Sequence, residues 1–200
     1  MVPDVAKGAQ TRERIVELAA GVFSERGFFG TSMTDLLAVT GLQKGGLYNH
    51  FAGKEQLALE SFDWSVGLVE ARYAAALDGV DGSVDRLLAI VDVIRGLCAD
   101  RALPGGCPIL TTAIEADDTM PALRDRAREA MTRWQRLIGG TVKAGVARGE
   151  LRPDADPYEV ATIVTATLEG AVFLSKLYDD DVHMLRAVDH VAAYVRGLTR

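Results

Sequence analysis

The segment from Phe28 to Phe51 constrains the fold most, because it combines two short helix patterns with a glycine between them. Ser32, followed three residues later by Asp35, is typical of a capping box, in which the two side chains hydrogen bond to backbone amides at the start of a helix. Gly41 can adopt the left-handed conformation that ends a helix. The pattern predicts a first helix of about two turns. We expect its buried side to be formed by Leu36, Leu37 and Val39.

The residues after Gly41 predict a second short helix with one buried face. Leu47 and Phe51 are four residues apart, which places them on the same side of a helix. The other positions carry polar, basic or glycine residues: Lys44, Gly45, Gly46, Tyr48, Asn49 and His50. Two helices joined at a glycine turn, the second with a polar and basic outer side, form the arrangement in which a helix enters the major groove of DNA.

The outer side of this second helix offers groups that can contact DNA. Lys44 can donate to guanine or to a phosphate, and Asn49 can pair with the edge of an adenine. Tyr48 and His50 offer donors to phosphate oxygens, although Tyr48 could also simply pack at the helix edge. Each of the two glycines weakens a helix by up to about 1 kcal/mol relative to alanine. Their presence therefore indicates a backbone that lies close to the groove.

The run TSMTDLLAVTGLQKGGLYNHFAGKEQL, from Thr31 to Leu57, resembles the helix-turn-helix of TetR/AcrR-type transcriptional repressors. The resemblance extends upstream through TRERIVELAAGVFSERGF and covers about the first third of the chain. This sequence departs from the usual pattern of the family at Leu37 and Thr40, where alanines are usual, at Gln43 and at Gly46. These departures concern the details of the DNA contacts.

The resemblance implies an all-α protein with two domains. It implies an N-terminal three-helix, helix-turn-helix DNA-binding domain over residues 1–53 and a larger helical effector-binding and dimerisation domain over residues 54–200. Base contacts are expected at the positions that match the family's base-contacting residues: Thr34, Lys44, Gly45, Gly46 and Asn49. Phosphate contacts are expected from Thr31, Ser32, Tyr48, His50 and Lys54. Repression is the usual mode of action in the family and is expected here for that reason.

The net charge of −6 is distributed unevenly along the chain. Residues 1–54 carry six Lys or Arg against five Asp or Glu, a net charge of +1, which leaves −7 for the remainder. Phosphate binding needs a local positive surface, and two copies side by side would double it. The acidic remainder is interpreted as an ordinary solvated surface. A hydrophobic content of 48%, with Ala, Leu, Arg and Glu at helical spacing, predicts a globular all-α chain.

Several other classes of protein are disfavoured by the sequence. No apolar run reaches the roughly 18 to 20 residues of a membrane-spanning helix, and no secretion signal is visible. We therefore expect a cytoplasmic protein that associates with the nucleoid through DNA and has no membrane partner. The two cysteines, Cys98 and Cys107, and three histidines do not form a metal-binding pattern, so neither a metal nor a cofactor is expected.

The sequence also lacks the common catalytic motifs, so we do not expect an enzyme. Four carboxylates, at Glu115, Asp117, Asp118 and Glu169, could in principle form a site, but their positions are typical of a helix cap and of helix surfaces. A helical protein-interaction module that does not bind DNA is a further alternative. The basic, aromatic second helix of the segment disfavours it.

Helical spacing continues through the rest of the chain. A helix is predicted from Thr11 to Gly27, after an irregular N-terminus, and a long one from Lys54 to about Leu77 that could act as a lever between the two domains. Further helices are predicted over 84–99, 109–115, 122–148 and 158–177, and a last one after the acidic break at 179–181.

The helix over 158–177 has apolar residues on more than one face. We predict that it and the last helix form half of a four-helix dimer interface, which resembles the way the TetR/AcrR family dimerises. A buried hairpin within a monomer is the alternative. The residues predicted to form the interface are Ile163, Val164, Leu168, Ala171, Val188, Val191 and Val195. A dimer implies a palindromic operator in double-stranded DNA.

A small-molecule effector, mostly apolar and of unknown identity, is expected to bind in the larger domain and to move the lever helix. The candidate lining residues are Trp64, Leu68, Cys107, Leu110, Met131, Trp134 and Phe173, and each could instead be a core residue. Cys107 could also act as a redox or electrophile sensor, because a helix N-terminus stabilises a thiolate. A structural role for this thiol is the simpler alternative.

Overall fold

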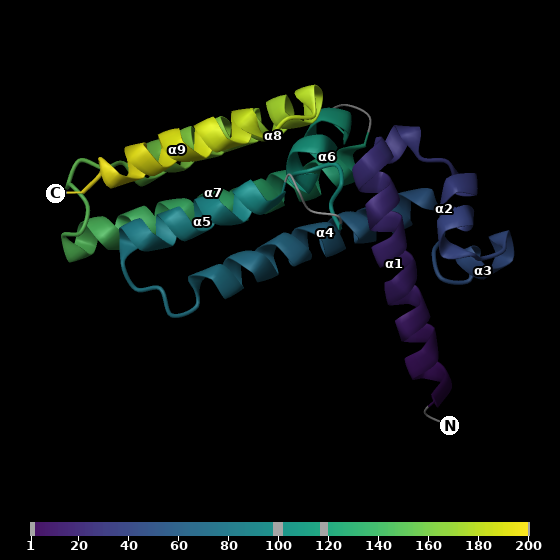
Figure 1. The fold of residues 1–200 in the computed structure, drawn as a ribbon. Helices are drawn as coiled ribbons and strands as arrows, with labels where there is room; N and C mark the ends of the chain where they lie inside the picture. Colours follow the sequence, from purple (N-terminus) through teal and green to yellow (C-terminus); the bar gives the residue numbers. More distant parts are fainter. Residues whose placement is uncertain (1–2, 98–101, 117–119, 200) are drawn as a thin grey trace. The chain divides into compact units, whose positions relative to one another are not determined.

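The computed structural model describes residues 3–97, 102–116 and 120–199, with the backbone alone described for residues 3–7. Cys98, Asp117 and Asp118 lie outside the described residues. Within these ranges the regular secondary structure is helical apart from an isolated bridge between Leu151 and Thr199, which confirms the predicted all-α class. The helices, shown in Figure 1, are α1 (Pro3–Gly30), α2 (Met33–Thr40), α3 (Lys44–Tyr48), α4 (Lys54–Leu77), α5 (Ser83–Leu97), α6 (Pro108–Ala116), α7 (Pro121–Arg148), α8 (Pro157–Tyr178) and α9 (Val182–Arg196).

Helix α1 is longer than the predicted helix at both ends. It begins at Pro3 rather than Thr11, and a proline is well suited to the first position of a helix because its missing N–H has no partner there anyway. At Gly27 the backbone leaves the helical conformation, with φ 71° and ψ 175°, before one further turn to Gly30. Gly27 is therefore a kink, and not the end of α1 as predicted.

Helix α2 has both predicted end structures. The Ser32 hydroxyl accepts from the Asp35 amide at 3.1 Å, and the Ser32 amide donates to Asp35 Oδ2 at 2.8 Å. Gly41, with φ 68°, donates to the Leu37 carbonyl. The prediction that Val39 is buried was wrong, since its side chain is 39% exposed. Around the helix, Leu37 lies on one side of the fully buried Leu36 and Val39 lies on the other, away from the core.

One apolar cluster fixes the positions of the first helices. It contains buried residues of α1, α2, α3 and α4 and the residue that follows α3: Ile15, Val16, Ala19, Leu36, Leu47, Leu57 and Phe51. Leu47 is the one fully buried side chain of α3 in this cluster, and Phe51 comes four residues later. The five-residue helix α3 is too short to be stable alone, so packing through Leu47 and Phe51 holds it in place.

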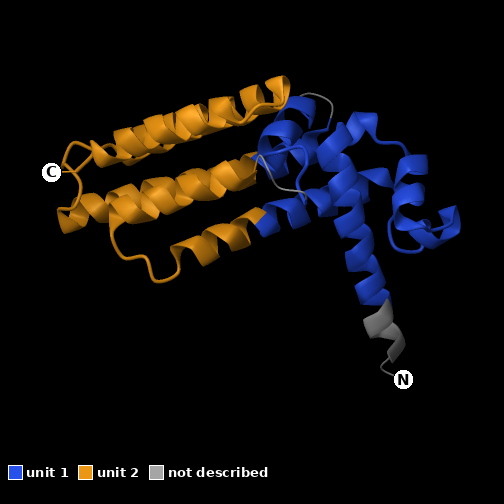
Figure 2. Cartoon of the chain, viewed as in Figure 1, with its two compact units in different colours: residues 1–68, 101–127 blue, residues 69–100, 128–200 orange. Residues whose placement is uncertain are grey.

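The chain divides into two compact units, coloured separately in Figure 2. Unit 1 comprises residues 1–68 and 101–127, and unit 2 comprises residues 69–100 and 128–200. Helices α4 and α7 each contribute to both units. Unit 1 therefore extends past residue 53, where the sequence places the end of the DNA-binding domain. That functional division of the chain stays a prediction.

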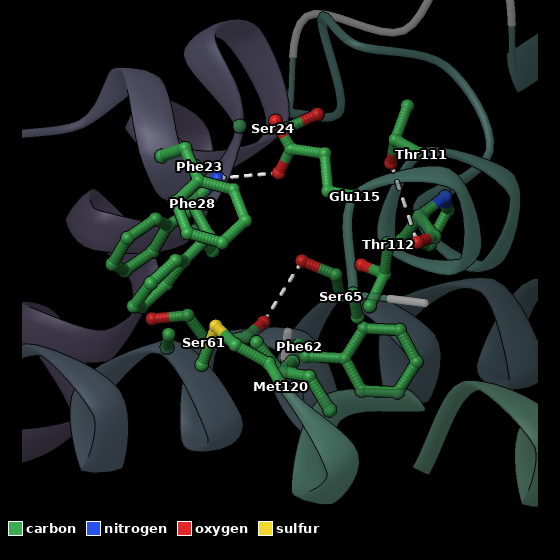
Figure 3. A pocket seen from close by; sticks show the side chains of 17 residues that line it. Phe23, Ser24, Phe28, Ser61, Phe62, Ser65, Thr111, Thr112, Glu115 and Met120 are labelled. Atoms are coloured by element: carbon green, nitrogen blue, oxygen red, sulfur yellow. Dashed lines mark hydrogen bonds between the residues drawn. The ribbon is translucent and has the colours of Figure 1, made fainter. Parts of the chain in front are cut away.

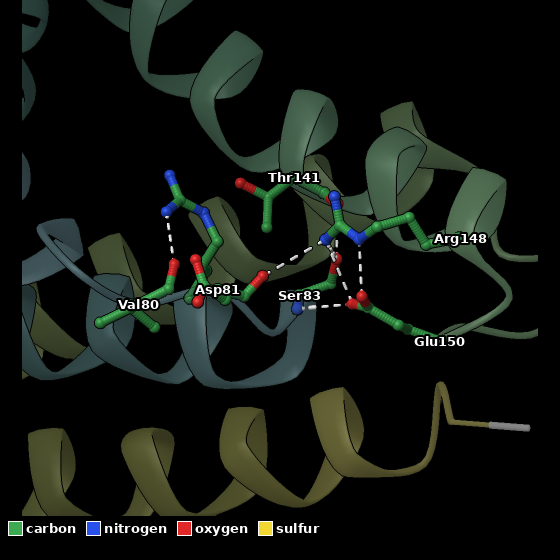
Figure 4. Close-up of polar contacts among 7 residues, drawn as sticks. Val80, Asp81, Ser83, Thr141, Arg148 and Glu150 are labelled. Carbon is green, nitrogen blue, oxygen red and sulfur yellow. Dashed lines mark hydrogen bonds and ion pairs between the residues drawn. The ribbon is translucent and has the colours of Figure 1, made fainter.

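Helices pack side by side within unit 2. Helix α9 packs against both α5 and α8, and the Trp134 indole of α7 donates to the Thr165 hydroxyl of α8 at 3.0 Å. Polar contacts join the start of α5 to the end of α7 (Figure 4): Glu150 accepts from the Ser83 amide at 2.7 Å and from Arg148 Nε at 2.6 Å. These contacts make unit 2 a helical body with its own core.

By length and composition alone, α8 could cross a membrane, although the prediction from the sequence was that no apolar run is long enough. Core helices of soluble proteins have the same properties. The residues of α8 that its own chain buries include Val160, Val164, Leu168 and Val172, and the helix packs along α9. Helix α8 is therefore an apolar helix of the unit 2 core.

Candidate functional site

Helix α3 presents a polar surface opposite its buried anchor. Leu47 points into the apolar cluster, whereas Lys44, Gly45, Tyr48 and Asn49 are exposed. Gly46 and His50 are half-buried. The Lys44 ammonium lies 6.0 Å from the centroid of the Tyr48 ring, so the cation and the phenol share one side of the helix. The structure thus brings together the predicted DNA-contacting residues of this helix.

The glycines of α3 have no packing role that explains them within the described residues. A Cβ at Gly45 would meet nothing within 4 Å, and a Cβ at Gly46 would make only ordinary contact with Leu42, at 3.7 Å. Neither glycine has a positive φ. Glycine weakens a helix, and contacts within the described residues do not require it at Gly45, whereas close approach of another molecule would favour it.

The predicted contacts on and before α2 fall into two groups. Ser32 and Thr34 are exposed beside the N-terminus of α2. Thr31 is buried, and its hydroxyl donates to the Gly27 carbonyl at 2.6 Å. The Thr31 side chain therefore belongs to the link between the α1 kink and α2, and this hydroxyl is not placed at the surface for a phosphate.

Three other cations of unit 1, namely Arg12, Arg26 and Lys54, have partners within the protein. The Arg12 guanidinium makes a two-point contact with the Glu60 carboxylate, with Nη2 donating to Oε1 at 2.6 Å, and this holds the pKa of Glu60 below its ordinary value. Arg26 donates to Asp35 at 2.8 Å. Lys54, predicted to bind phosphate, has its ammonium 4.0 Å from the centroid of the Phe28 ring. Lys44 is exposed at the start of α3.

A pocket in unit 1 lies among α1, α4, α6 and the first part of α7. It contains about 540 Å³ of space not filled by atoms, open solvent included. Figure 3 shows hydroxyl, carboxylate and aromatic side chains around it. The lining comprises Ala20, Phe23, Ser24, Gly27, Phe28, Phe29, Ala58, Ser61, Phe62, Ser65, Pro108, Thr111, Thr112, Glu115, Ala116, Met120 and Leu123. None of the seven residues predicted to line an effector site is among them.

Sequence reasoning missed this pocket, although one signal was present. Ser61 and Ser65 are one helical turn apart on a helix whose neighbouring positions are apolar, and both are buried. Such a hydroxyl pair on a buried helix face indicates a polar interior. Glu115 was assigned to a helix surface, but its carboxylate accepts from the Phe28 amide at 2.6 Å.

The seven predicted effector residues are divided between the two units and differ in burial. Trp64 packs against the apolar cluster that holds α3, and Leu68, Leu110 and Met131 are half-buried. Trp134 is buried, with its ring 4.8 Å from that of Tyr73 and its N–H bonded to Thr165. Phe173 is 52% exposed. Trp134 is thus a core residue whose indole N–H has a hydrogen-bond partner.

Cys107 directly precedes α6, and its side chain is 5% exposed. Its carbonyl accepts from the Thr111 amide at 3.2 Å, which places it at the N-terminal end of the helix. Burial limits access of oxidants to this sulfur. Among the described residues, no group of three or more His, Cys, Asp or Glu side chains could hold a metal ion.

Six of the seven predicted interface residues are buried within the chain itself: Val164, Leu168, Ala171, Val188, Val191 and Val195. Ile163 is half-buried. Because a partner cannot cover side chains that are already covered, these six residues form the core of unit 2. The exposed side of α8 is formed by other residues: Thr162, Ala166, Gly170, Phe173 and Leu177.

Two family models match the chain. One, described as bacterial regulatory proteins of the tetR family, matches residues 15–60. The other, described as a tetracyclin repressor-like C-terminal domain, matches residues 83–191. The first match contains the apolar cluster, α2 and α3, and the second contains most of unit 2.

Known proteins resemble this chain over nearly its whole length. A TetR transcriptional regulator from Chloroflexus aurantiacus J-10-FL has 44% sequence identity and a TM-score of 0.93, with 98% of each chain covered. An uncharacterized HTH-type transcriptional regulator of Mycobacterium tuberculosis is 32% identical over 193 residues, which are 94% of this chain and 93% of that protein. A cysteine mutant of the TetR-family regulator CifR, complexed with 26-bp double-strand operator DNA, shares the fold, with a TM-score of 0.80 at 23% identity over 90% of this chain and 93% of that chain.

Proposed function

Because the chain belongs to the TetR family of transcriptional regulators, we propose that it is a dimeric repressor that binds a palindromic operator and is released by a small-molecule effector. Members of this family are DNA-binding regulators of the cytoplasm and not enzymes. The proposal adds four parts to this family membership: dimerisation, the symmetry of the operator, the response to an effector and residence on the nucleoid.

The observation that carries the proposal is the geometry of α3. Leu47 fixes the helix to the core, and the opposite side presents Lys44, Tyr48 and Asn49 together with the bare backbone of Gly45. A lysine and an asparagine can read base edges in the major groove, and a backbone without a side chain can approach DNA closely. The base contacts of Thr34, Gly45, Gly46, Lys44 and Asn49, and the phosphate contacts of Ser32, Tyr48, His50 and Lys54, are proposed on this basis.

A single α3 reads only a few base pairs, so specificity requires a second copy on a matching half-site. The exposed side of α8 supports such a dimer. Thr162, Ala166 and Gly170 follow each other at four-residue spacing and are small enough for a second helix to approach closely, and Phe173 and Leu177 add exposed apolar area. Two α8–α9 pairs would then form a four-helix interface.

Selection of bound fragments from random duplex DNA tests the proposal directly. We expect an enriched inverted repeat whose two halves are separated by about one helical turn. The affinity for this DNA is expected to fall steeply with salt, and Lys44→Ala should make the slope shallower by about one per half-site. Lys143→Ala, which removes an exposed lysine of α7 in unit 2, is the matched control. A protein that enriches no sequence would contradict the proposal.

A thiol-based response through Cys107 is the second candidate. The position at the start of α6 favours a reactive thiolate, but burial of the side chain opposes it. Burial is expected to dominate, so hydrogen peroxide should leave the DNA affinity of the wild-type protein and of Cys107→Ser equally unchanged in a fluorescence anisotropy titration. A loss of DNA binding in the wild type alone would instead establish the thiol as the sensor.

A further inference from the structure

The unit 1 pocket has a wall of hydrogen-bond acceptors. Three of its hydroxyls already donate their proton to backbone carbonyls: Ser61 to Val16 at 3.3 Å, Ser65 to Ser61 at 2.9 Å, and Thr111 to Cys107 at 3.2 Å. A hydroxyl whose proton is engaged can only accept from a ligand. Glu115 adds a carboxylate, which is an acceptor at every site when ionised. The hydroxyls of Ser24, which accepts from the Gly105 amide at 2.9 Å, and of Thr112 can still donate, so acceptors predominate in the polar part of the wall without being its only groups. This part of the wall thus favours a ligand that donates hydrogen bonds.

The apolar part of the wall favours the same kind of ligand. Four phenylalanine side chains line the pocket: Phe23, Phe28, Phe29 and Phe62. The faces of aromatic rings attract cations and bury apolar groups. A carboxylate in such surroundings repels an anionic ligand and attracts a cationic one.

From this combination we propose that the pocket among α1, α4 and α6 is an effector site for a lipophilic amine, whose ammonium group binds Glu115 and whose apolar body lies against the phenylalanines. The inference rests on the proposed function in one respect, namely that an effector controls DNA binding. It differs from the predicted effector site, whose seven residues do not line this pocket.

Glu115 is also the group through which occupancy would reach the DNA-binding helices. Its carboxylate accepts from the Phe28 amide at the α1 kink. One residue earlier, the Gly27 carbonyl accepts from the Thr31 hydroxyl, directly before the Ser32 cap of α2. An amine that binds Glu115 from the pocket would draw the carboxylate away from the Phe28 amide and so loosen the kink that holds the start of α2.

Among the described residues, Lys54 is a cation that interacts electrostatically with Glu115. Its ammonium lies against the Phe28 ring, burial lowers the pKa of Lys54, and the charge of Glu115 raises it. Lys54 itself does not line the pocket. A ligand ammonium would compensate the negative charge of Glu115. The charged form of Lys54 would then be stabilised less by that carboxylate.

The test uses three probes with one apolar body and different head groups: phenylbutylamine, phenylbutanol and phenylbutyrate. Isothermal titration of the full-length protein should show saturable binding of the amine at concentrations up to about 10 mM, weaker binding of the alcohol and none of the carboxylate. Glu115→Gln, which keeps an acceptor for the Phe28 amide, should weaken amine binding about tenfold and leave alcohol binding nearly unchanged. Glu129→Gln, the same charge change at an exposed position of α7, should have no effect.

A second variant separates binding from folding. Thr112 lines the pocket, and Thr112→Phe should fill it and abolish binding of the amine and the alcohol. The variant should still unfold cooperatively on heating, as a folded protein does, and should still bind DNA. In the wild type, the amine should weaken DNA binding at least about fivefold.

Each remaining outcome counts against the inference. Failure of the amine to bind, or equal binding to wild type and Glu115→Gln, would overturn the site. Amine binding without a change in DNA affinity would overturn its role as an effector site. DNA binding measured without any probe remains the separate test of the proposed function, so the two can fail independently.

Discussion

Gly45 is the residue at which stability and function are expected to oppose each other. Apart from its chain neighbours and the backbone of its own helix, nothing among the described residues lies within 4 Å of where its Cβ would be, and α3 is helical there. Gly45→Ala should therefore raise the free energy of unfolding by up to about 1 kcal/mol, yet weaken DNA binding because the methyl group meets the DNA. Urea unfolding and anisotropy titrations measure the two effects.

Gly140→Ala is the matched control for Gly45, since Gly140 is an exposed helical glycine of α7 that also has open space around it. It should stabilise the protein similarly and leave DNA affinity unchanged. Equal DNA affinity of Gly45→Ala and wild type would show that the backbone of α3 does not approach the duplex closely.

Glu150 makes the stability of unit 2 depend on pH. Hydrogen bonds from Arg148 and from the Ser83 amide and hydroxyl lower the pKa of Glu150 from 4.5 to about 2. A carboxyl with a lowered folded pKa stabilises the fold above its unfolded value, and this contribution is lost as the pH falls from about 4.5 to 2. The urea midpoint of Glu150→Gln should thus lie below that of the wild type at neutral pH and approach it toward about pH 2.

The control for Glu150 is Glu129→Gln, an exposed glutamate of α7. Its urea midpoint should follow that of the wild type across the same pH range. A Glu150 carboxyl that titrates near its ordinary pKa in an NMR experiment would contradict the assigned contacts.

At the scale of elements, two glycines with positive φ end or break helices for different reasons. Gly27, with φ 71° and ψ 175°, occupies a region open almost only to glycine, and a Cβ there would lie 1.8 Å from Glu115 Oε1. Gly41, with φ 68° and ψ 14°, is in the left-handed helical region with open space around it. The first position is constrained by a neighbouring helix, the second only by its own backbone.

Gly41→Ala should therefore cost about 1–2 kcal/mol of unfolding free energy, the strain of a left-handed residue alone. Gly27→Ala should cost more, because the methyl group also displaces the Glu115 carboxylate from the Phe28 amide. Chemical denaturation of both variants gives the comparison. If Gly27→Ala proved no more destabilising than Gly41→Ala, the contact between α6 and the kink would contribute little.

For the whole molecule, the decisive question is whether the exposed side of α8 joins two copies. A Cβ at Gly170 has open space within the chain, so Gly170→Glu should not disturb the protomer and should make α8 a better helix. In a dimer the same charge would be buried without a partner, which is costly. Analytical ultracentrifugation should find a monomer, with strongly weakened operator binding.

Gly140→Glu introduces the same residue at an exposed glycine of α7 with equally open surroundings. It should remain a dimer and bind the operator. A Gly170→Glu protein that still sediments as a dimer would place the interface elsewhere.

Short-range interactions made much of this protein predictable from its sequence. The capping box of Ser32 and Asp35 and the left-handed turn at Gly41 involve neighbours in the chain, and the structure confirms both. The polar side of α3 follows from its spacing relative to Leu47. The family resemblance predicted from the sequence rests on the same segment, because its residues carry the helix-turn-helix pattern, and a family model matches it.

The tertiary structure alone decided which apolar faces are core and which are surface. On α8, more than one face carries apolar residues, so the sequence could not show that Val164 and Leu168 are buried while Phe173 and Leu177 are exposed. The unit 1 pocket depends on Glu115 meeting Phe28 across 87 residues of sequence. Local patterns specify where helices begin and end and which of their faces are polar. Burial and pockets depend on which helices meet, and that is set by packing between residues far apart in the chain.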